Sequence, residues 1–406
     1  MSSKKGNIYL VWNYKNWGGA QIYFLAIIKA ALRDWNIEVW LPRGSSEQFI
    51  TFLEELNVKY VFLEHFAVFE EVSGVSAKIK RQFLRIRSEI EIYFRLTQLD
   101  KRKSVVHLES APWQSWILIS LLSLKGYATF VTIHNFPAIQ GLYRTIISKL
   151  RLGIVSRLRN FHVFTANKDT KNKFRGWFSD NFWKRIDVTY AGIDPIQVSQ
   201  ALTNLDVSAK RRVFGIPEET LSVLSVGQFV DRKGRWVLLD SIKQICNDHD
   251  NIRFFWLMPD LPNDSDRKRI DSYELKDKFT TVLSSDVGGK RVDILQFIKT
   301  ADIFVLPSYL EGLPISLLEA MALGVPCIST RINAIPEALI DEDTGLLISP
   351  GSSVQLTDAI IRLVHNEELR LKIGEQSRMK VLAEFDERKA SMIVLGRYAD
   401  AIKKDG

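Results

Sequence analysis

Short apolar runs alternate along the chain with longer segments in which apolar residues recur every three or four positions. Strand-like runs occur at residues 8–12, 221–226 and 303–306, and a helix-like segment follows each of them. A continuous apolar run is typical of a strand in a parallel sheet that is covered on both faces. The alternation continues to the C-terminus and predicts α/β architecture with doubly wound sheets rather than an all-α or all-β protein.

Length and composition indicate two domains. The chain has 406 residues, of which 46% are hydrophobic and 25% charged, an ordinary globular mixture that can bury two sizeable cores. We expect an N-terminal domain at residues 1–195, a second domain at 196–385, and a last helix at 386–406 that crosses back to the first domain.

The most informative segment is 307–351. Its apolar positions take helical spacing from Ile315, directly after the strand 303–306. We therefore expect residues 312–316 to form the first turn of a helix, at the carboxyl end of a parallel strand, where ligand crevices lie. The unpaired N–H groups of such a turn suit an anion such as pyrophosphate.

Two carboxylates flank this turn. Glu311 precedes it, and Glu319 lies eight positions later, too far for one helical face to explain. We expect them to accept hydrogen bonds from sugar or ribose hydroxyls. The alternative is that both side chains merely cap or solvate the helix.

A second loop supports the same kind of site. Residues 227–234 join the strand 221–226 to another apolar-periodic helix and contain Arg232 and Lys233. These cations could contact phosphate oxygens. The alternative is two solvated charges on a loop.

Taken together, these residues resemble the signature of the retaining glycosyltransferases of family 4. The matching features are Glu311-Gly312, Glu319 to Ala322, Gly324 with Pro326, Pro336-Glu337 and Gly345. The resemblance implies the GT-B fold, in which two Rossmann-like domains face each other across a deep cleft. It also implies transfer of a sugar from a nucleotide-sugar, without a bound metal or other cofactor.

The resemblance also implies roles for individual residues. Glu319 would hold the ribose hydroxyls, Glu311 the donor sugar, and Lys233 the diphosphate, with Arg232 compensating for Gln228, which stands where Arg is usual. The other expected donor contacts come from the two loops that precede helices: Gly227, Gln228, Gly312, Leu313, Pro314, Ile315 and Ser316. Pro314 replaces a common Gly, and Asn333-Ala334 stands where the family usually has Gly-Gly.

The first half contributes a further candidate loop, Asn16, Trp17, Gly18 and Gly19, between the first strand and a helix. Its glycines permit close backbone approach at a helix N-terminus. The spacing is not the dinucleotide-binding fingerprint, which argues against a nicotinamide enzyme. By resemblance the loop lines the cleft near the diphosphate and the acceptor, with Asn16 and Trp17 on the acceptor side; a plain turn is the alternative.

His134 and Glu109 each follow or end an apolar strand-like run. The resemblance places His134 close to the donor sugar, and Glu109 is a candidate acceptor contact. A structural histidine or an ordinary strand end are the alternatives for these two residues.

No acid is singled out as a nucleophile, so the resemblance implies front-face substitution, in which the leaving diphosphate helps to deprotonate the acceptor. A nucleotide-sugar epimerase of the same architecture and a degraded, non-catalytic sugar-binding protein stay open. UDP is the expected nucleotide, and a cell-surface polysaccharide or lipid-linked glycan is the expected acceptor.

Positive charge is concentrated in the first half. Residues 78–103 and 144–185 are both strongly basic, although the whole chain carries only +8. Within the first segment, one apolar stripe has helical spacing: Ile79, Phe83, Ile86, Ile90 and Phe94. A basic amphipathic helix suits an anionic membrane surface or a lipid-diphosphate acceptor. The alternative is a surface helix that packs its stripe on the core. No nucleic-acid module is recognisable, so nucleic acid is not an expected partner.

The remaining features concern location. Cys246 and Cys327 are expected to be buried thiols, without disulfide or metal spacing. The run 8–12 is too short for a signal peptide, and residues 116–133 are expected to form helix, turn and strand rather than a membrane span. We therefore expect a cytoplasmic protein, with the inner face of the plasma membrane as a candidate peripheral site.

Overall fold

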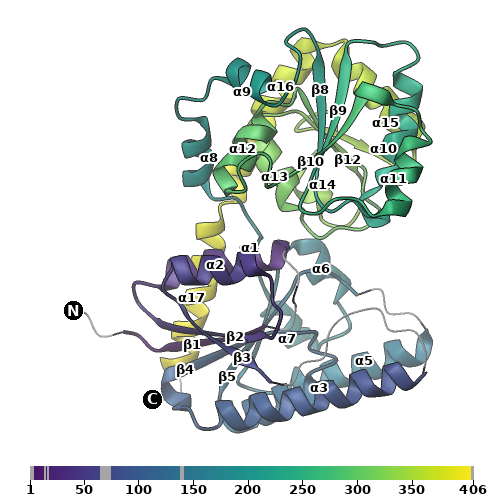
Figure 1. Ribbon diagram of the computed structural model, residues 1–406. Coiled ribbons are helices and arrows are strands. Elements are labelled where there is room, and N and C mark those ends of the chain that lie inside the picture. The colour runs from purple at the N-terminus through teal and green to yellow at the C-terminus, as the bar shows by residue number, and fades with distance from the viewer. Residues whose placement is uncertain (1–3, 13–14, 16–17, 65–74, 138–140, 404–406) are drawn as a thin grey trace. The chain divides into compact units, whose positions relative to one another are not determined.

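The computed structural model describes residues 4–12, 15, 18–64, 75–137 and 141–403 (Figure 1). The chain divides into two compact units. Unit 1 comprises residues 1–191 and 387–406, and unit 2 comprises residues 192–386. No helix within the described ranges is both long and apolar enough to cross a membrane.

Unit 1 is built on a parallel sheet with the strand order β3-β2-β1-β4-β5-β6-β7. Its strands are β1 Asn7–Trp12, β2 Asn36–Pro42, β3 Lys59–Leu63, β4 Ser104–Glu109, β5 Ala128–Ile133, β6 Phe161–Thr165 and β7 Asp187–Val188. Its helices are α1 Gly19–Ala31, α2 Glu47–Glu55, α3 Val75–Leu96, α4 Trp116–Leu124, α5 Leu142–Val155, α6 Lys168–Lys173, α7 Asp180–Lys184 and α17 Glu387–Lys403, with a 3₁₀ turn at Lys101–Lys103.

The helices of unit 1 cover both faces of its sheet. Right-handed crossovers place α1 and α2 on one face, and α3, α4 and α5 on the other, because the chain moves outward from β1 first in one direction and then in the opposite one. Figure 1 shows α1 and α2 on the side of the sheet opposite α3 and α5. The last helix, α17, packs against α1, β4 and β5.

Unit 2 repeats this architecture with the strand order β10-β9-β8-β11-β12-β13, again parallel. Its strands are β8 Leu221–Val226, β9 Ile252–Met258, β10 Phe279–Leu283, β11 Ile303–Leu306, β12 Cys327–Thr330 and β13 Leu346–Ile348. Its helices are α8 Pro195–Leu202, α9 Val207–Val213, α10 Arg235–Ile245, α11 Asp264–Asp271, α12 Arg291–Lys299, α13 Ile315–Ala322, α14 Ile335–Ala338, α15 Ser353–Val364 and α16 Glu367–Glu384, with 3₁₀ turns at Asp231–Lys233 and Lys276–Lys278. Doubly wound α/β architecture, the predicted fold class, is confirmed.

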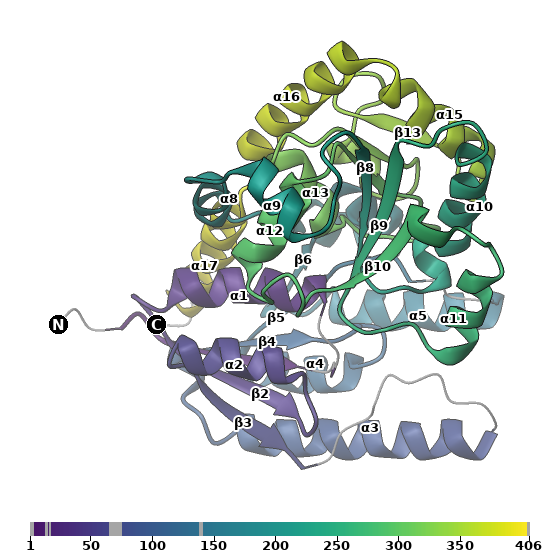
Figure 2. The same ribbon diagram turned by 45° about the horizontal axis from the view of Figure 1, so that its top comes forward.

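In both units the strand order reverses beside the first strand of the sheet. The reversal lies between β1 and β4 in unit 1 and between β8 and β11 in unit 2. Ligands of open α/β sheets bind beyond the carboxyl ends of the strands at such a point. In unit 2 this point is formed by the loops that follow β8 and β11 and lead into α10 and α13, two helices that Figure 2 labels.

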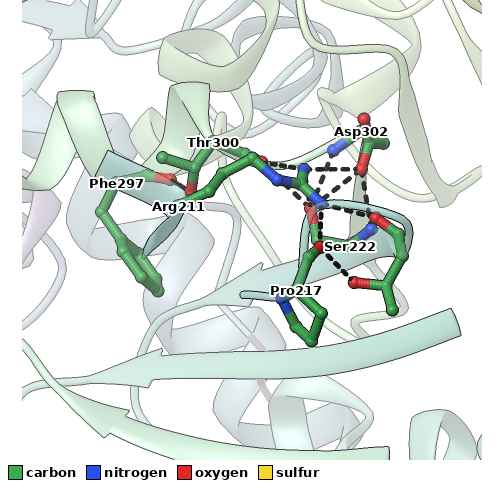
Figure 3. Close-up of polar contacts among 7 residues, drawn as sticks. Arg211, Pro217, Ser222, Phe297, Thr300 and Asp302 are labelled. Atoms are coloured by element: carbon green, nitrogen blue, oxygen red, sulfur yellow. Dashed lines mark hydrogen bonds and ion pairs between the residues drawn. The ribbon is translucent and has the colours of Figure 1, made fainter. Parts of the chain in front are cut away.

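A polar cluster fixes the amino ends of these two strands. Arg211, from α9, donates to the Asp302 carboxylate at 2.9 Å and to the Thr300 carbonyl at 2.9 Å. Asp302 also accepts hydrogen bonds from the backbone N–H and the hydroxyl of Ser222, at 2.7 and 3.0 Å. Figure 3 shows how these side chains converge. Because Ser222 lies on β8 and Asp302 directly precedes β11, the cluster holds the two strands in register.

Candidate functional site in unit 2 and its counterpart in unit 1

The loops that follow β8 and β11 approach each other most tightly at Gly234 and Pro307. Gly234 has a φ of 73°, in the left-handed region, and a Cβ atom built on it would lie 1.9 Å from the Pro307 carbonyl oxygen. Only glycine can meet both conditions. The backbone N–H of Tyr309 also donates to the Arg232 carbonyl at 2.8 Å. The two loops are therefore packed directly against each other.

Lys233, Arg232 and Glu311 form a charge cluster at this junction. The Lys233 Nζ lies 2.6 Å from Glu311 Oε1, and the Arg232 guanidinium lies 3.5 Å from Glu311 Oε2. Lys233 and Glu311 are buried, whereas Arg232 is partly exposed. The Ser308 hydroxyl donates to Glu311 Oε1 at 2.9 Å. Sequence reasoning placed these charges on separate loops, and the fold brings them together.

Asn333 supports Glu311 from a third loop. Its side-chain amide donates to the Glu311 carbonyl at 2.7 Å, and its φ of 43° lies in the left-handed region. Asparagine tolerates this conformation better than most residues that have a side chain. The departure from Gly-Gly at Asn333-Ala334 therefore keeps a backbone conformation that glycine adopts readily, and it adds a side-chain contact.

Glu319 lies inside α13 and is paired with Arg291, the first residue of α12. The carboxylate is almost completely buried. Burial raises the pKa of Glu319 above its ordinary value, and the Arg291 charge opposes that rise. A buried carboxylate with a single cationic partner keeps capacity to accept hydrogen bonds from hydroxyl groups.

The helix after Glu311 begins later than expected. Residues 312–316 were predicted to form its first turn, but α13 begins at Ile315, and Pro314 is its N-cap with φ −72° and ψ 120°. Gly312 and Leu313 therefore precede the helix. Proline also disfavours helical conformation in the residue before it, which here is Leu313. The Ser316 hydroxyl donates to the Val226 carbonyl at the end of β8, at 3.4 Å.

The loop that carries Lys233 is supported from its outer side. The Arg235 guanidinium donates to the Phe229 carbonyl at 2.8 Å and to the Asp231 and Asp266 carboxylates at 2.8 and 2.6 Å. Gly227 accepts a hydrogen bond from the indole of Trp256 at 2.8 Å. The side chain of Gln228 is exposed.

In unit 1 the fold brings Glu109 and His134 together. Glu109 is the last residue of β4, and His134 directly follows β5. Their side chains approach to 3.4 Å, between Glu109 Oε1 and His134 Nε2. The His134 carbonyl accepts a hydrogen bond from the Asn167 amide at 3.0 Å, and the ring packs edge-on against Tyr23.

Behind this pair lies a buried network that sequence reasoning missed. His107, on β4, contacts the Tyr398 hydroxyl through Nδ1 and the Thr132 hydroxyl through Nε2, the latter at 3.0 Å. Burial lowers the pKa of His107 to about 3, and nearby His134 adds to the effect. Tyr398 belongs to α17, so this network ties the last helix to the sheet of unit 1.

The remaining predicted residues of unit 1 lie at the start of α1. Gly18 is the N-cap of α1, with extended backbone, and Gly19 is the first residue of the helix. A Cβ atom on Gly18 would make only an ordinary contact with Gln21, at 3.6 Å. Asn16 and Trp17 lie outside the described residues.

Sequence reasoning missed Arg291, Ser308 and Asn333 as contacts of the two predicted acids. Arg291 follows Gly288, Gly289 and Lys290, and a basic residue after a glycine pair beyond a strand could have drawn attention to it. Across the described ranges, no group of three or more His, Cys, Asp or Glu side chains is placed to hold a metal ion.

Comparison with known families identifies the segment that carries this site. The family of glycosyl transferases group 1 matches residues 206–380, which include both acids, both cations and all three missed contacts. Residues 206–380 are a glycosyl transferase group 1 domain. The family assignment inferred from the acidic signature is thereby confirmed for this domain.

Two curated relatives show how the sequence similarity varies in identity and in length. The chain is 36% identical over 117 residues to the N-acetyl-alpha-D-glucosaminyl L-malate synthase of Bacillus anthracis, covering 29% of this chain and 31% of that protein. It is 23% identical over 315 residues to the UDP-Gal:alpha-D-GlcNAc-diphosphoundecaprenol alpha-1,3-galactosyltransferase of Escherichia coli, covering 70% and 79%. The match thus spans about a third of the Bacillus protein.

Solved structures extend the likeness from the group 1 domain to the whole chain. A glycosyltransferase from Rickettsia africae superposes with a TM-score of 0.75 at 15% identity, covering 99% of this chain and 100% of the other. Anabaena HepE, solved in complex with UDP and glucose, superposes with a TM-score of 0.74 at 14% identity, covering 97% and 100%. These likenesses show the fold, which is of the GT-B type with two Rossmann-like units.

Proposed function

We propose that this protein is a retaining glycosyltransferase that moves a sugar from a nucleotide-sugar, with UDP as the nucleotide, to a glycan or lipid-linked acceptor in cell-surface polysaccharide synthesis. The observation that carries the proposal is the cluster of Lys233, Arg232 and Glu311 at the strand-order reversal of a group 1 domain. The names of the Escherichia coli relative and of the Anabaena structure support a UDP-sugar donor and a lipid-linked acceptor.

The proposal assigns the nucleotide to unit 2. Lys233 and Arg232 neutralise the diphosphate, the backbone N–H groups around Ile315 and Ser316 face it, and Glu319 accepts hydrogen bonds from the ribose hydroxyls. Glu311 accepts hydrogen bonds from the sugar hydroxyls. Lys233 and Ser308 hold its carboxylate in the position that this role requires. Cationic side chains act here as preorganised electrostatic stabilisers of the departing charge.

The chemical step breaks the bond between the anomeric carbon and the distal phosphate oxygen of UDP. The acceptor oxygen bonds to the same face of that carbon, so the configuration is retained. The acceptor proton passes to the departing phosphate oxygen. In unit 1, Glu109 and His134 approach each other at the carboxyl edge of the sheet, where Glu109 is the proposed acceptor contact. No step requires a metal ion, because the cations of unit 2 stabilise the leaving group.

Calorimetric titration of the full chain with UDP, GDP and ADP tests the nucleotide assignment. We expect saturable binding of UDP, and a donor screen with a lipid-linked acceptor should then yield a glycosylated product whose anomeric configuration matches the donor, at a rate that EDTA leaves unchanged. Absence of binding to any nucleotide would instead favour the non-catalytic protein. Isomerisation of the donor without an acceptor would favour the epimerase.

A further inference from the structure

The outer face of the helix layer α3, α4 and α5 in unit 1 is apolar. Among the described residues, about half of the large hydrophobic side chains that lie exposed belong to these three helices, each with between 42% and 77% of its surface accessible. Scattered exposed hydrophobic residues are normal on proteins, but a concentration on neighbouring elements marks an interaction site. The function proposed for unit 2 does not use this face.

Helix α3 carries the clearest part of this face. Its apolar stripe consists of side chains that are all more than half exposed: Ile79, Phe83, Ile86, Ile90 and Phe94. The structure therefore excludes one of the two alternatives left open by the sequence, the packing of the stripe on the core. The stripe does not pack on the core of unit 1 but points away from it.

The inward side of α3 is unusually polar. Ile92 and Leu96 are buried near its C-terminus, but the preceding turns direct Arg85, Ser88 and Glu89 inward. The Arg85 Nε and Glu89 Oε1 atoms are buried without a hydrogen bond of their own, although the two side chains attract each other and the Glu89 carboxylate is hydrogen-bonded to Ser115. Burying polar groups while exposing an apolar stripe costs free energy in water. The orientation of α3 is therefore suited to an environment other than water.

Helices α4 and α5 continue the apolar face. All three helices contribute inward side chains to the same core of unit 1, and α4 contacts both α3 and α5. Their outward side chains consequently share one side of the layer. On α4 these include Ile117 and Leu124, and on α5 they include Leu142, Ile146 and Leu150.

Basic residues accompany this apolar face. Helix α3 has six Lys and Arg against two Glu, and α5 has three Lys and Arg with no acid, although Arg85 points inward and Arg151 donates to the Trp113 carbonyl. Lys80, Arg87, Arg144 and Lys149 are exposed. A second copy of the same face would bring like charges together, which opposes symmetric dimerisation. An anionic lipid surface instead accepts both the apolar side chains and the cations, whose stems can extend along it.

We propose that the outer face of α3, α4 and α5 docks this protein on an anionic lipid membrane surface. The apolar side chains enter the boundary between headgroups and acyl chains, and the cations contact lipid phosphates. The cytoplasmic leaflet, which carries a negative surface potential, is a surface of this kind. The proposal depends on unit 1 alone and stands whether or not unit 2 binds a nucleotide.

Vesicle flotation with the full chain tests the proposal. The wild-type protein should float with vesicles of phosphatidylcholine and phosphatidylglycerol, float poorly with phosphatidylcholine alone, and be released as salt concentration rises. No flotation with the anionic vesicles would overturn the proposal. Equal flotation with both vesicle types would overturn the electrostatic part of it.

Two sets of variants locate the surface. Phe83→Ser, Ile90→Ser and Leu150→Ser combined should lower partitioning on the order of a hundredfold, and Lys80→Gln, Arg87→Gln and Arg144→Gln combined should lower it at least about tenfold.

Matched controls come from exposed side chains of unit 2. The apolar control combines Val354→Ser, Leu371→Ser and Met379→Ser, and the basic control combines Lys243→Gln, Lys268→Gln and Lys372→Gln. Each of these two combined variants should bind vesicles like the wild type. Wild-type binding by the serine variant of unit 1 would contradict the proposal. Sedimentation without lipid gives a second test. A dimer of the wild-type protein that the serine variant of unit 1 does not form would also contradict the proposal, because the face would then join two copies of the chain.

Discussion

The Lys233 ammonium lies 2.6 Å from the Glu311 carboxylate, and the two residues come from loops that follow different strands. This pairing joins the cation assigned to the diphosphate with the acid assigned to the sugar. The two parts of the donor would therefore meet protein groups that hold each other in position. Such preorganisation limits the rearrangement needed when charge develops on a leaving group.

Substitution of Lys233 by alanine should lower kcat about a hundredfold or more, because it removes a positioned cation from the departing diphosphate. Steady-state transfer rates at saturating donor measure this effect. Lys243→Ala, which changes an exposed lysine on the following helix, is the control and should keep normal rates. Turnover of Lys233→Ala near the wild-type value would show that Lys233 does not contact the diphosphate.

Substitution of Gly234 by alanine should destabilise unit 2 by roughly 3 kcal/mol, since the new methyl group would collide with the Pro307 carbonyl and the backbone would also be strained. Urea unfolding measures the change. Gly289 is a matched control, because its φ of 74° is almost the same but its Cβ would meet open space. Gly289→Ala should cost only about 1 kcal/mol. Equal losses in the two variants would mean that the contact with Pro307 is unimportant.

The raised pKa of Glu319 predicts a pH dependence of stability. The folded state holds a proton on this carboxyl more tightly than the unfolded state does, so its contribution to stability should decline as pH rises from about its ordinary value of 4.5 through the raised folded value. Glu319→Gln should remove that decline. Arg291→Met should enlarge it, because the cation that opposes the rise is lost. Urea unfolding of the wild type, the two single variants and the double variant over this pH range forms a double-mutant cycle. This cycle tests whether the pH dependence of stability comes from Glu319. Equal pH slopes in Arg291→Met and the wild type would contradict it.

His107 predicts the opposite sign in unit 1. Its folded pKa of about 3 lies below the ordinary value of 6.5, so its contribution to stability is complete above 6.5 and is lost as pH falls toward 3. The protection factors for amide hydrogen exchange in β4, which correct for the intrinsic pH dependence of exchange, should therefore fall across that window. In His107→Gln, which can still form hydrogen bonds, this part of the acid sensitivity should disappear. An unchanged acid dependence in the variant would assign the effect to other groups.

Local rules were sufficient to predict the architecture and several elements. The apolar runs at 221–226 and 303–306 are β8 and β11, and residues 116–133 form helix, turn and strand as expected. Each of these depends on neighbouring residues only. The helices α8 and α9 were not predicted, although Asp194 with Pro195 and Asp206 are recognisable helix-start residues.

Contacts between distant segments could not be predicted in the same way. Periodicity reveals that α3 has an apolar stripe, but the direction in which the stripe points depends on how the helix packs on the sheet. The pairing of Arg291 with Glu319 likewise depends on two helices, α12 and α13, that the fold brings together. A long cationic side chain can reach many acids, and sequence spacing alone does not choose among them.

The tight approach of Gly234 to Pro307 also bears on how this domain can be recombined. A chimaera that imports only residues 227–234 from another glycosyltransferase receives a loop whose conformation is adapted to a different partner loop. Exchange of that segment together with residues 307–311 transfers a matched pair. Donor preference should therefore be inherited through these two segments as a single module, rather than through either one alone.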